Sequence, residues 1–341
     1  MRRSQWFLVM AVISSVAIPN AAADTLLVPA QYPTLQAAVD SAVTGDVVVV
    51  ANGTWKGSGN RDVRLGGADI VIRSAAGPAS CILDCEGTTE VPFRGFLIES
   101  GETRATVIQG FTIRRGATLS GAVSDPFNGG GIRILGSSPT IRDCVFEDNI
   151  SGCWGGALYA GHGGTPLITN CTFRHNYSND DGGAIFNWNG AHPEVRDCLF
   201  VDNDARVTGG AITAFDTIFV SHVTIVGSDA PFGAAIYASD AQISNSILWG
   251  NGLGPIDGST SVRYSIVEGG QPGEGNLGVD PLFALDGYHL RQHSPAIGAG
   301  DPAFVPAPGE VDIDGQRRLT GARVDMGADE SRLAPRYRLP R

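Results

Sequence analysis

The sequence contains very little lysine and no long hydrophobic segment beyond its first residues. Lys56 is the only lysine among the 341 residues, and the formal net charge is −11. A strongly acidic surface does not attract phosphate backbones, so nucleic acid is not an expected partner. After residue 23, no apolar run approaches the roughly 20 residues that a membrane-spanning helix requires. We therefore expect no integral membrane segment in the mature chain.

The six cysteines lack the spacing of a zinc site. They are Cys81, Cys85, Cys144, Cys153, Cys171 and Cys198. Three of them, Cys144, Cys171 and Cys198, are 27 residues apart. We expect these three to be free thiols in the interior, where cysteine behaves as a small apolar residue. Cys81 and Cys85 can instead form a disulfide with each other, since an exported protein permits disulfides.

The N-terminus has the pattern of a secretory signal peptide. Arg2 and Arg3 precede an apolar stretch over residues 6–18, and three alanines precede Asp24. The apolar stretch is too short to span a membrane comfortably, and small residues favour cleavage. We expect residues 1–23 to be removed and the mature protein to be secreted or held in the cell envelope.

Residues 128–251 contain one segment repeated five times. Besides the cysteines, a phenylalanine and an asparagine recur every 27 residues. They are Phe146, Phe173 and Phe200, and Asn149, Asn176 and Asn203. Within each repeat the apolar residues alternate, which indicates strands, and no helical period follows the glycines. Such a short repeat buries its apolar face only by stacking on its neighbours, so the sequence predicts an all-β, parallel β-helix solenoid.

Residues one period apart are then expected to lie directly above one another, about 4.8 Å apart. Phenylalanines and thiols would stack inside. Polar residues at the bend between strands would bond to each other and to the turn backbone. These bend residues are Asp143, Asn170, Asp197 and Asn245. Glycine pairs would form the tight turns. The pairs are Gly130 and Gly131, Gly155 and Gly156, Gly182 and Gly183, and Gly209 and Gly210.

The first coil is expected to carry a helical cap. A strand over Thr25–Val28 precedes Pro33 and Thr34, which are typical of a helix start. Leu35, Ala38, Val39 and Ala42 then recur at helical spacing before a strand at 47–50. An amphipathic helix there would cover the open end of the solenoid. A loop insertion is expected at Gly121–Phe127.

Two stretches resemble known proteins. The opening TLLVPAQYPTLQAAVDSAVTGDVVVVANGTW and the repeated Gly-Gly and Ile-x-Asn-Cys-x-Phe patterns resemble bacterial secreted proteins of the right-handed parallel β-helix, pectin-lyase-like superfamily. The resemblance implies a right-handed solenoid over 24–290 but no single activity, because that superfamily includes lyases, hydrolases and adhesins.

VDIDGQRRLTGARVDMGADE is similar to the C-terminal region of β-helix proteins with a choice-of-anchor Q domain. The matching residues are Asp312, Asp314, Gly315, Arg318, Asp325, Gly327, Ala328 and Glu330. This resemblance implies an irregular cap over 291–330. A short basic tail, 331–341, follows it.

Catalytic motifs of the superfamily are incomplete here. Its lyases use an Arg or Lys base beside Ca²⁺-binding carboxylates, and no arginine of the repeats recurs with such a cluster. Its polygalacturonate hydrolases use paired carboxylates and a Gly-His-Gly, which Asp180, Asp181 and His162 match in part. However, His162 precedes the aspartates, and the Arg-Ile-Lys motif is missing. The alternative is that Asp180-Asp181 forms the turn before Gly182, in the slot that Trp154 and Thr208 hold in adjacent repeats.

An aromatic row is the main candidate for binding. If Leu158, Ile185 and Ile236 point inward, then Tyr159, Phe186 and Tyr237 point outward on successive coils, flanked by Trp154 and Trp188. Outward rings can stack on sugars or on a protein partner. The alternative is ordinary aromatic packing beneath loops.

The acidic turn at Glu310, Asp312 and Asp314 has two interpretations. Clustered carboxylates can bind Ca²⁺, although the spacing is not that of an EF-hand. The alternative is ion pairing to Arg317, Arg318 or Arg323.

Three functions therefore remain open. The first is an exported, non-catalytic surface protein that presents a face to a glycan or a protein. The second is a polysaccharide lyase or glycoside hydrolase, and the third is a structural component of the envelope.

Overall fold

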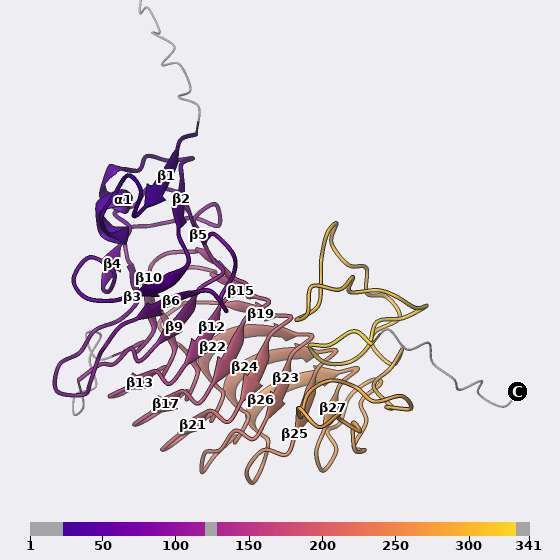
Figure 1. Ribbon diagram of the computed structural model, residues 1–341. Helices are drawn as coiled ribbons and strands as arrows, with labels where there is room; N and C mark the ends of the chain where they lie inside the picture. Colours follow the sequence, from indigo (N-terminus) through magenta and orange to yellow (C-terminus); the bar gives the residue numbers. More distant parts are fainter. Residues whose placement is uncertain (1–22, 120–127, 332–341) are drawn as a thin grey trace, which may run out of the picture.

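The computed structural model describes residues 23–119 and 128–331. The predicted signal peptide except residue 23, the expected insertion at 121–127, and the basic tail except residue 331 lie outside the described residues. The described part contains one helix, α1 (Leu35–Ser41), and strands β1 to β27. Every pairing between these strands is parallel, and the coils stack in sequence order (Figure 1). The predicted parallel β-helix is confirmed.

Three long faces run along the solenoid. Face 1 contains β4 (Val63–Arg64), β7 (Phe96–Ile98), β10 (Ile132–Leu135), β14 (Leu158–Gly161) and β18 (Ile185–Asn187). Face 2 contains β1 (Thr25–Val28), β2 (Val47–Val50), β5 (Val71–Ser74), β8 (Val107–Gln109), β11 (Thr140–Arg142), β15 (Leu167–Thr169) and β19 (Glu194–Arg196). Three long strands continue both faces: β22 (Ile212–Ser221), β24 (Ile236–Ser244) and β26 (Ile256–Arg263).

Face 3 is a separate nine-stranded sheet. It contains β3 (Gly53–Trp55), β6 (Cys81–Asp84), β9 (Thr112–Arg114), β12 (Val145–Glu147), β16 (Thr172–Arg174), β20 (Leu199–Val201), β23 (Thr224–Val226), β25 (Ile247–Trp249) and β27 (Ile266–Val267). A small third sheet joins β13 (Ile150–Ser151), β17 (Tyr177–Ser178) and β21 (Asp204–Ala205).

The phenylalanines and cysteines of the repeat form the core, as predicted. Phe146, Phe173 and Phe200 pair in register and are fully buried. Their rings stack with centroids 4.8 Å apart at both steps, nearly parallel at 4° and 7°. All six cysteines are buried free thiols. The alternative of a Cys81–Cys85 disulfide is therefore wrong, because both thiols are buried in the apolar core instead.

The recurring asparagines form a buried amide ladder. The Asn149 Nδ2 donates to Asn176 Oδ1 at 3.0 Å, and the Asn176 Nδ2 donates to Asn203 Oδ1 at 2.9 Å. Each Nδ2 also donates to a backbone carbonyl of the preceding coil, that of Ile113, Phe146 or Phe173. These bonds satisfy the amides inside the solenoid. Amide stacking was expected instead at Asp143, Asn170, Asp197 and Asn245. There, Asp143 accepts the Gln109 amide, and the other three contact residues 301–318.

The glycine pairs serve the turns for two separate reasons. The first glycine of each pair has positive φ, as at Gly155 (67°) and Gly182 (68°), which residues with a side chain rarely adopt. The second glycine has no room for a Cβ, which at Gly156 would overlap the carbonyl oxygen of Gly183 in the next coil. In the first repeat the pair is Gly129 and Gly130, so the predicted pair was one residue too late.

The N-terminal helix caps the first coil as predicted. Thr34 is its N-cap, and the threonine Oγ1 accepts the Ala37 N–H at 3.3 Å. The helix buries Leu35, Ala38 and Val39 against the core.

The chain leaves the solenoid after β27. The last parallel bridge joins Ile266 to Leu277. Residues 280–331, called the C-terminal segment below, contain no helix or strand among the described residues and lie beside the last coils (Figure 1). The one helix of the described residues, α1, is not long and apolar enough to cross a membrane.

Candidate functional site

The predicted aromatic row is in the outward register but does not face solvent. Tyr159 pairs with Phe186 on face 1, while the neighbouring Leu158 and Ile185 point into the core. Tyr159 and Phe186 are nevertheless fully buried, and Tyr237 is half-buried. The expectation of a solvent-exposed aromatic ribbon is therefore wrong.

A layer of further aromatic rings covers this row. The Trp154 ring stacks on Tyr159 and Phe186 with centroids 6.4 and 4.9 Å away. Trp188 meets Trp154 edge-on at 5.3 Å, so both tryptophans flank the row as predicted. This packing resembles that of a second small core.

Phe215 belongs to the same aromatic layer and was missed from the sequence. Its ring lies 5.5 Å from Phe186 and 5.9 Å from Tyr237, edge-on to both. Its ring fills the gap in the row at Thr213, which is not aromatic. This gap between Phe186 and Tyr237 was the sequence signal that a nearby aromatic residue completes the layer. Phe215 and Trp188 remain 37% and 43% exposed, so only the rim of the layer reaches solvent.

The candidate catalytic residues do not converge. Asp181 accepts the Thr208 hydroxyl at 2.7 Å and is bridged in parallel to Trp154 and Thr208. His162 lies past the other end of β14, where its ring is 3.3 Å from the Asn189 amide. Among the described residues, neither of the two groups of potential metal ligands contains Asp180, Asp181 or His162.

Asp181 therefore occupies the same position as Trp154 and Thr208, as the turn interpretation predicted. Burial raises the pKa of Asp181, and the Thr208 hydrogen bond opposes that rise. Asp180 lies against the Cys153 thiol, with Oδ2 3.8 Å from Sγ. These contacts explain both aspartates as parts of the stacked turn.

The acidic turn is held by backbone contacts and by a histidine. The Asp312 carboxylate is buried and accepts the N–H groups of Asp314, Gln316 and Glu330. The Asp314 Oδ2 lies 2.5 Å from His289 Nε2. Asp314, His289 and Asp329 form one group of closely spaced potential ligands, and Ca²⁺ binding by Asp312 and Asp314 stays a prediction.

Within the described residues, Glu310, Asp312 and Asp314 do not form the predicted ion pairs with Arg317, Arg318 or Arg323. Arg318 is fully buried and pairs with Asp197 of the solenoid at 2.7 Å. Arg323 instead donates to the carbonyls of Ala299 and Gly300.

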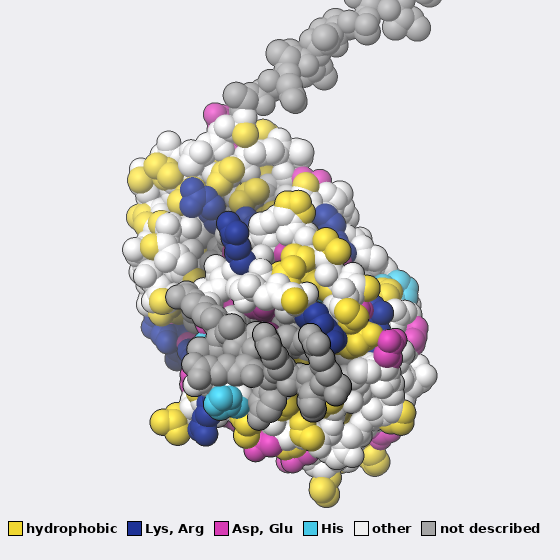
Figure 2. Space-filling model, turned by 90° about the vertical axis from the view of Figure 1, so that its right-hand side faces the viewer, with side chains coloured by type: hydrophobic (Ala, Val, Ile, Leu, Met, Phe, Trp, Pro, Cys, Tyr) yellow, Lys and Arg dark blue, Asp and Glu magenta, His cyan; other side chains and the backbone are white. Residues whose placement is uncertain are grey.

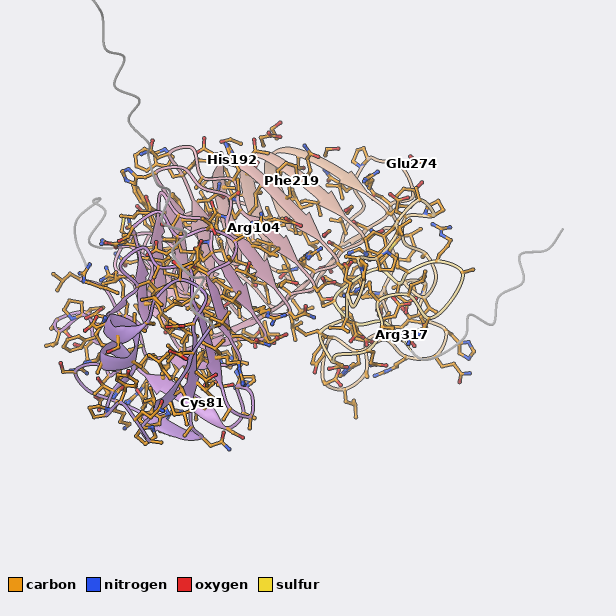
Figure 3. All side chains as sticks on the ribbon, turned by 90° about the horizontal axis from the view of Figure 1, so that it is seen from above. Cys81, Arg104, His192, Phe219, Glu274 and Arg317 are labelled. Atoms are coloured by element: carbon orange, nitrogen blue, oxygen red, sulfur yellow. The ribbon has the colours of Figure 1, made fainter. Side chains whose placement is uncertain are left out.

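An open groove of about 430 Å³ lies on face 2, where the strands become long. Two outward rows of side chains line it across β19, β22, β24 and β26. The first row is Glu194, Phe219, Gln242 and Ser261, and the second includes Ser221, Ser244 and Arg263. Phe219 is 43% exposed and faces away from the core (Figure 3). Sequence reasoning missed this site because the row that contains Phe219 has a different side chain on every coil.

Charges in the groove are already paired at its edges. Glu194 Oε2 lies 3.3 Å from Arg104 Nη1, and Arg263 Nη1 lies 3.2 Å from Asp301 Oδ2. In a different view, Figure 2 shows both basic (dark blue) and acidic (magenta) side chains on the face that it presents. The groove therefore offers hydroxyl and amide groups around one ring, with no concentration of one charge.

Residues at the bend between face 2 and face 3 contact the C-terminal segment. We call four of them the bend ladder: Asn170, Asp197, His222 and Asn245. Each has a positive φ of 51–54°. The Asn170 Nδ2 donates to the carbonyls of Val311 and Asp312 at 3.0 and 2.7 Å. The Asn245 Oδ1 accepts the Asp301 N–H at 2.7 Å. The expectation that Asp143, Asn170, Asp197 and Asn245 bond to one another is wrong. The C-terminal segment supplies the partners of the last three, and Asp143 accepts the Gln109 side-chain amide at 2.8 Å.

Two members of the bend ladder are buried and titratable. Burial raises the pKa of Asp197 to about 6, against the opposing charge of Arg318. Burial, followed by the charges of Arg318 and Arg196, lowers the pKa of His222 well below its usual value. The charged form of the His222 imidazole is therefore disfavoured, and its ring lies 4.4 Å from that of Phe304.

Comparison with known families agrees with the solenoid. The family model described as "Right handed beta helix region" matches residues 82–266, more than half of the chain. The matched range begins within β6 and ends at the first residue of β27, so it covers the regular coils between them. No curated protein matches the sequence.

Proposed function

Since the chain belongs to the right handed beta helix family, whose fold fits the pectin-lyase-like superfamily, we propose that it is an exported, non-catalytic protein that binds a glycan through face 2. The family supplies a scaffold of stacked coils and no single activity. The function therefore depends on the side chains that this chain places on its outward faces.

The exposed Phe219 ring in the face 2 groove carries the proposal. A phenyl ring complements the apolar face of a pyranose, and hydroxyl and amide groups complement its hydroxyls. Gln242, Ser221 and Ser244 supply these polar groups beside the ring. Because coils repeat about every 4.8 Å, an extended chain of sugars can follow the groove across several strands.

The charge balance favours a neutral glycan over a polyuronate. The groove contains one carboxylate, Glu194, and one guanidinium, Arg263, and each already has an oppositely charged partner. A polyuronate would need a row of free positive charges along its path. With a single carboxylate in its lining, the groove also lacks the pair that glycoside hydrolysis uses.

Export and surface location rest on the sequence pattern at the two ends. The basic, apolar and small-residue pattern of 1–23 supports secretion. The likeness of residues 311–330 to a choice-of-anchor Q region supports a location at the cell surface or in the extracellular space.

Binding assays with purified protein test the proposal. The protein would be titrated with neutral glycans and with polyuronates, with and without Ca²⁺. We expect Phe219→Ala to weaken binding of the neutral glycan by about tenfold or more, since an aromatic anchor at a site's centre carries much of the affinity. Phe232→Ala is the matched control, because Phe232 is also exposed but lies outside the groove.

Two results would contradict this assignment. One is unchanged affinity of Phe219→Ala together with loss in a Trp188→Ala, Phe215→Ala double variant, which would move the site to the rim of the aromatic layer. The other is release of unsaturated or reducing products from any glycan, which would make the protein an enzyme.

A further inference from the structure

A buried cluster of charged side chains lies where the C-terminal segment meets the bend ladder, apart from the lining residues of the groove. Asp197 precedes β20, His222 precedes β23, and Glu310 belongs to the C-terminal segment. One donor atom from each residue lies within 4.8 Å of the other two. Three elements far apart in the sequence therefore bring an imidazole and two carboxylates together.

Ordinary hydrogen bonding within the protein does not account for this cluster. His222 is 1% exposed, and in the described part of the chain neither of its ring nitrogens has a hydrogen-bond partner. The Asp197 oxygens likewise find no well-aligned donor there, although Oδ1 is ion-paired with Arg318. Leaving a buried polar group without a partner destabilises the folded state. The arrangement is therefore destabilising unless a ligand binds the His222 nitrogens and the Asp197 oxygens.

We propose that Asp197, His222 and Glu310 bind a divalent transition-metal ion of the Zn²⁺ class. A neutral imidazole with two carboxylates is a ligand set that suits zinc and its neighbours, whereas Ca²⁺ prefers oxygen ligands alone. Glu310 has an oxygen for this role, since Oε2 accepts the Ala307 N–H while Oε1 lies 4.0 Å from Arg196 Nη1.

Arg318 positions the Asp197 carboxylate for the ion. Its Nη2 lies 2.7 Å from Oδ1, and its guanidinium also donates to the carbonyls of Gly327 and Ala328. Oδ2 remains for the metal, and a hydrogen-bonded partner behind a ligating carboxylate fixes its orientation. The bound ion fastens the C-terminal segment to two successive coils.

The test uses the full mature chain, stripped with a chelator and titrated with ZnCl₂ by calorimetry. We expect one saturable ion per chain and a higher Tm in its presence. His222→Gln and Glu310→Gln are each expected to weaken Zn²⁺ binding by about tenfold or more. His289→Gln is the matched control, because His289 lies in the other group of potential ligands, with Asp314 and Asp329.

A second readout is independent of affinity. Zn²⁺ should slow hydrogen exchange of residues 304–318 in the parent protein and leave exchange unchanged in His222→Gln. The Glu310 side chain is at the edge of the cluster, 7% exposed, so Glu310→Gln keeps the test valid should the His222 variant fail to fold. Absence of saturable Zn²⁺ binding, unchanged affinity in both cluster variants, or loss of binding in His289→Gln would overturn the proposal.

Discussion

The regular coils and the C-terminal segment are held by different kinds of contact. In the coils, core side chains stack on the residue at the same position one coil away, as Phe146, Phe173 and Phe200 do. In the C-terminal segment, each contact occurs once, as in the buried pair of Arg318 with Asp197. The comparison teaches that repetition distributes stability over many equal steps, whereas the irregular segment depends on a few buried polar groups.

The largest effect is expected in the phenylalanine stack. Phe173→Ala should lower the free energy of unfolding by about 3–5 kcal/mol, because it opens a cavity between two stacked rings. Phe186→Ala should cost a similar amount, since Phe186 is just as buried beneath Trp154. Urea unfolding measures both. A small loss for Phe186→Ala would mean that the aromatic layer is loose in solution.

A loss of similar size, confined to the other region, is expected from Arg318→Met. Removing one partner of a buried ion pair typically costs about 3–5 kcal/mol, because the remaining charge of Asp197 stays buried. The coils do not depend on this pair, so faster hydrogen exchange should appear in residues 301–330 and not in the Phe173 stack. Equal acceleration in both regions would show that the segment and the coils unfold together.

Asparagine gives the closest matched comparison between the two regions. Asn176→Ala should cost about 1–3 kcal/mol, because it leaves buried groups of both neighbouring coils without partners. Asn170→Ala should cost about 0.5–1.5 kcal/mol, since Asn170 is half-buried and only holds the C-terminal segment. Thermal melts of the two variants decide the order, and a larger loss for Asn170→Ala would contradict it.

The smallest effect is expected from pH, through His289. Partial burial disfavours the charged imidazole, but hydrogen bonds to Asp286 and Asp314 outweigh it and raise the pKa of His289 from 6.5 to about 9. A raised pKa means that this contribution is complete below pH 6.5 and disappears as the pH rises through 9. The stability difference between the parent and His289→Gln should shrink over that window. A difference that grows with pH would mean that the charged His289 imidazole does not stabilise the folded state.

Much of the fold could be predicted from the sequence, because each residue of a coil stacks on the residue one period away. The 27-residue step of Cys144, Cys171 and Cys198 predicted the parallel register that the structure shows. Helix α1 was equally accessible, since its cap Thr34 and its apolar face lie within one short stretch.

The candidate site could be predicted less well. The alternation of residues along a strand shows which side chains point outward, but not which of them reach solvent. The alternation of Leu158 and Tyr159 correctly placed the tyrosine outward, but whether solvent reaches it depends on Trp154, which packs over it from a turn. In the groove, the exposed Phe219 belongs to a row whose members differ on every coil, so no period marks it.

The sequence by itself determined the parallel β-helix, its buried ladders and its capped first coil. The β-helix and its phenylalanine and cysteine ladders follow from side chains that meet their own equivalents one period away. The helical cap follows from the N-cap Thr34 and the helical spacing of apolar residues within one short stretch. Only the tertiary structure decided what the bend ladder contacts, because Asn170 meets Asp312 across 142 residues. A contact that occurs once, between segments without a shared period, leaves no regular pattern in the chain.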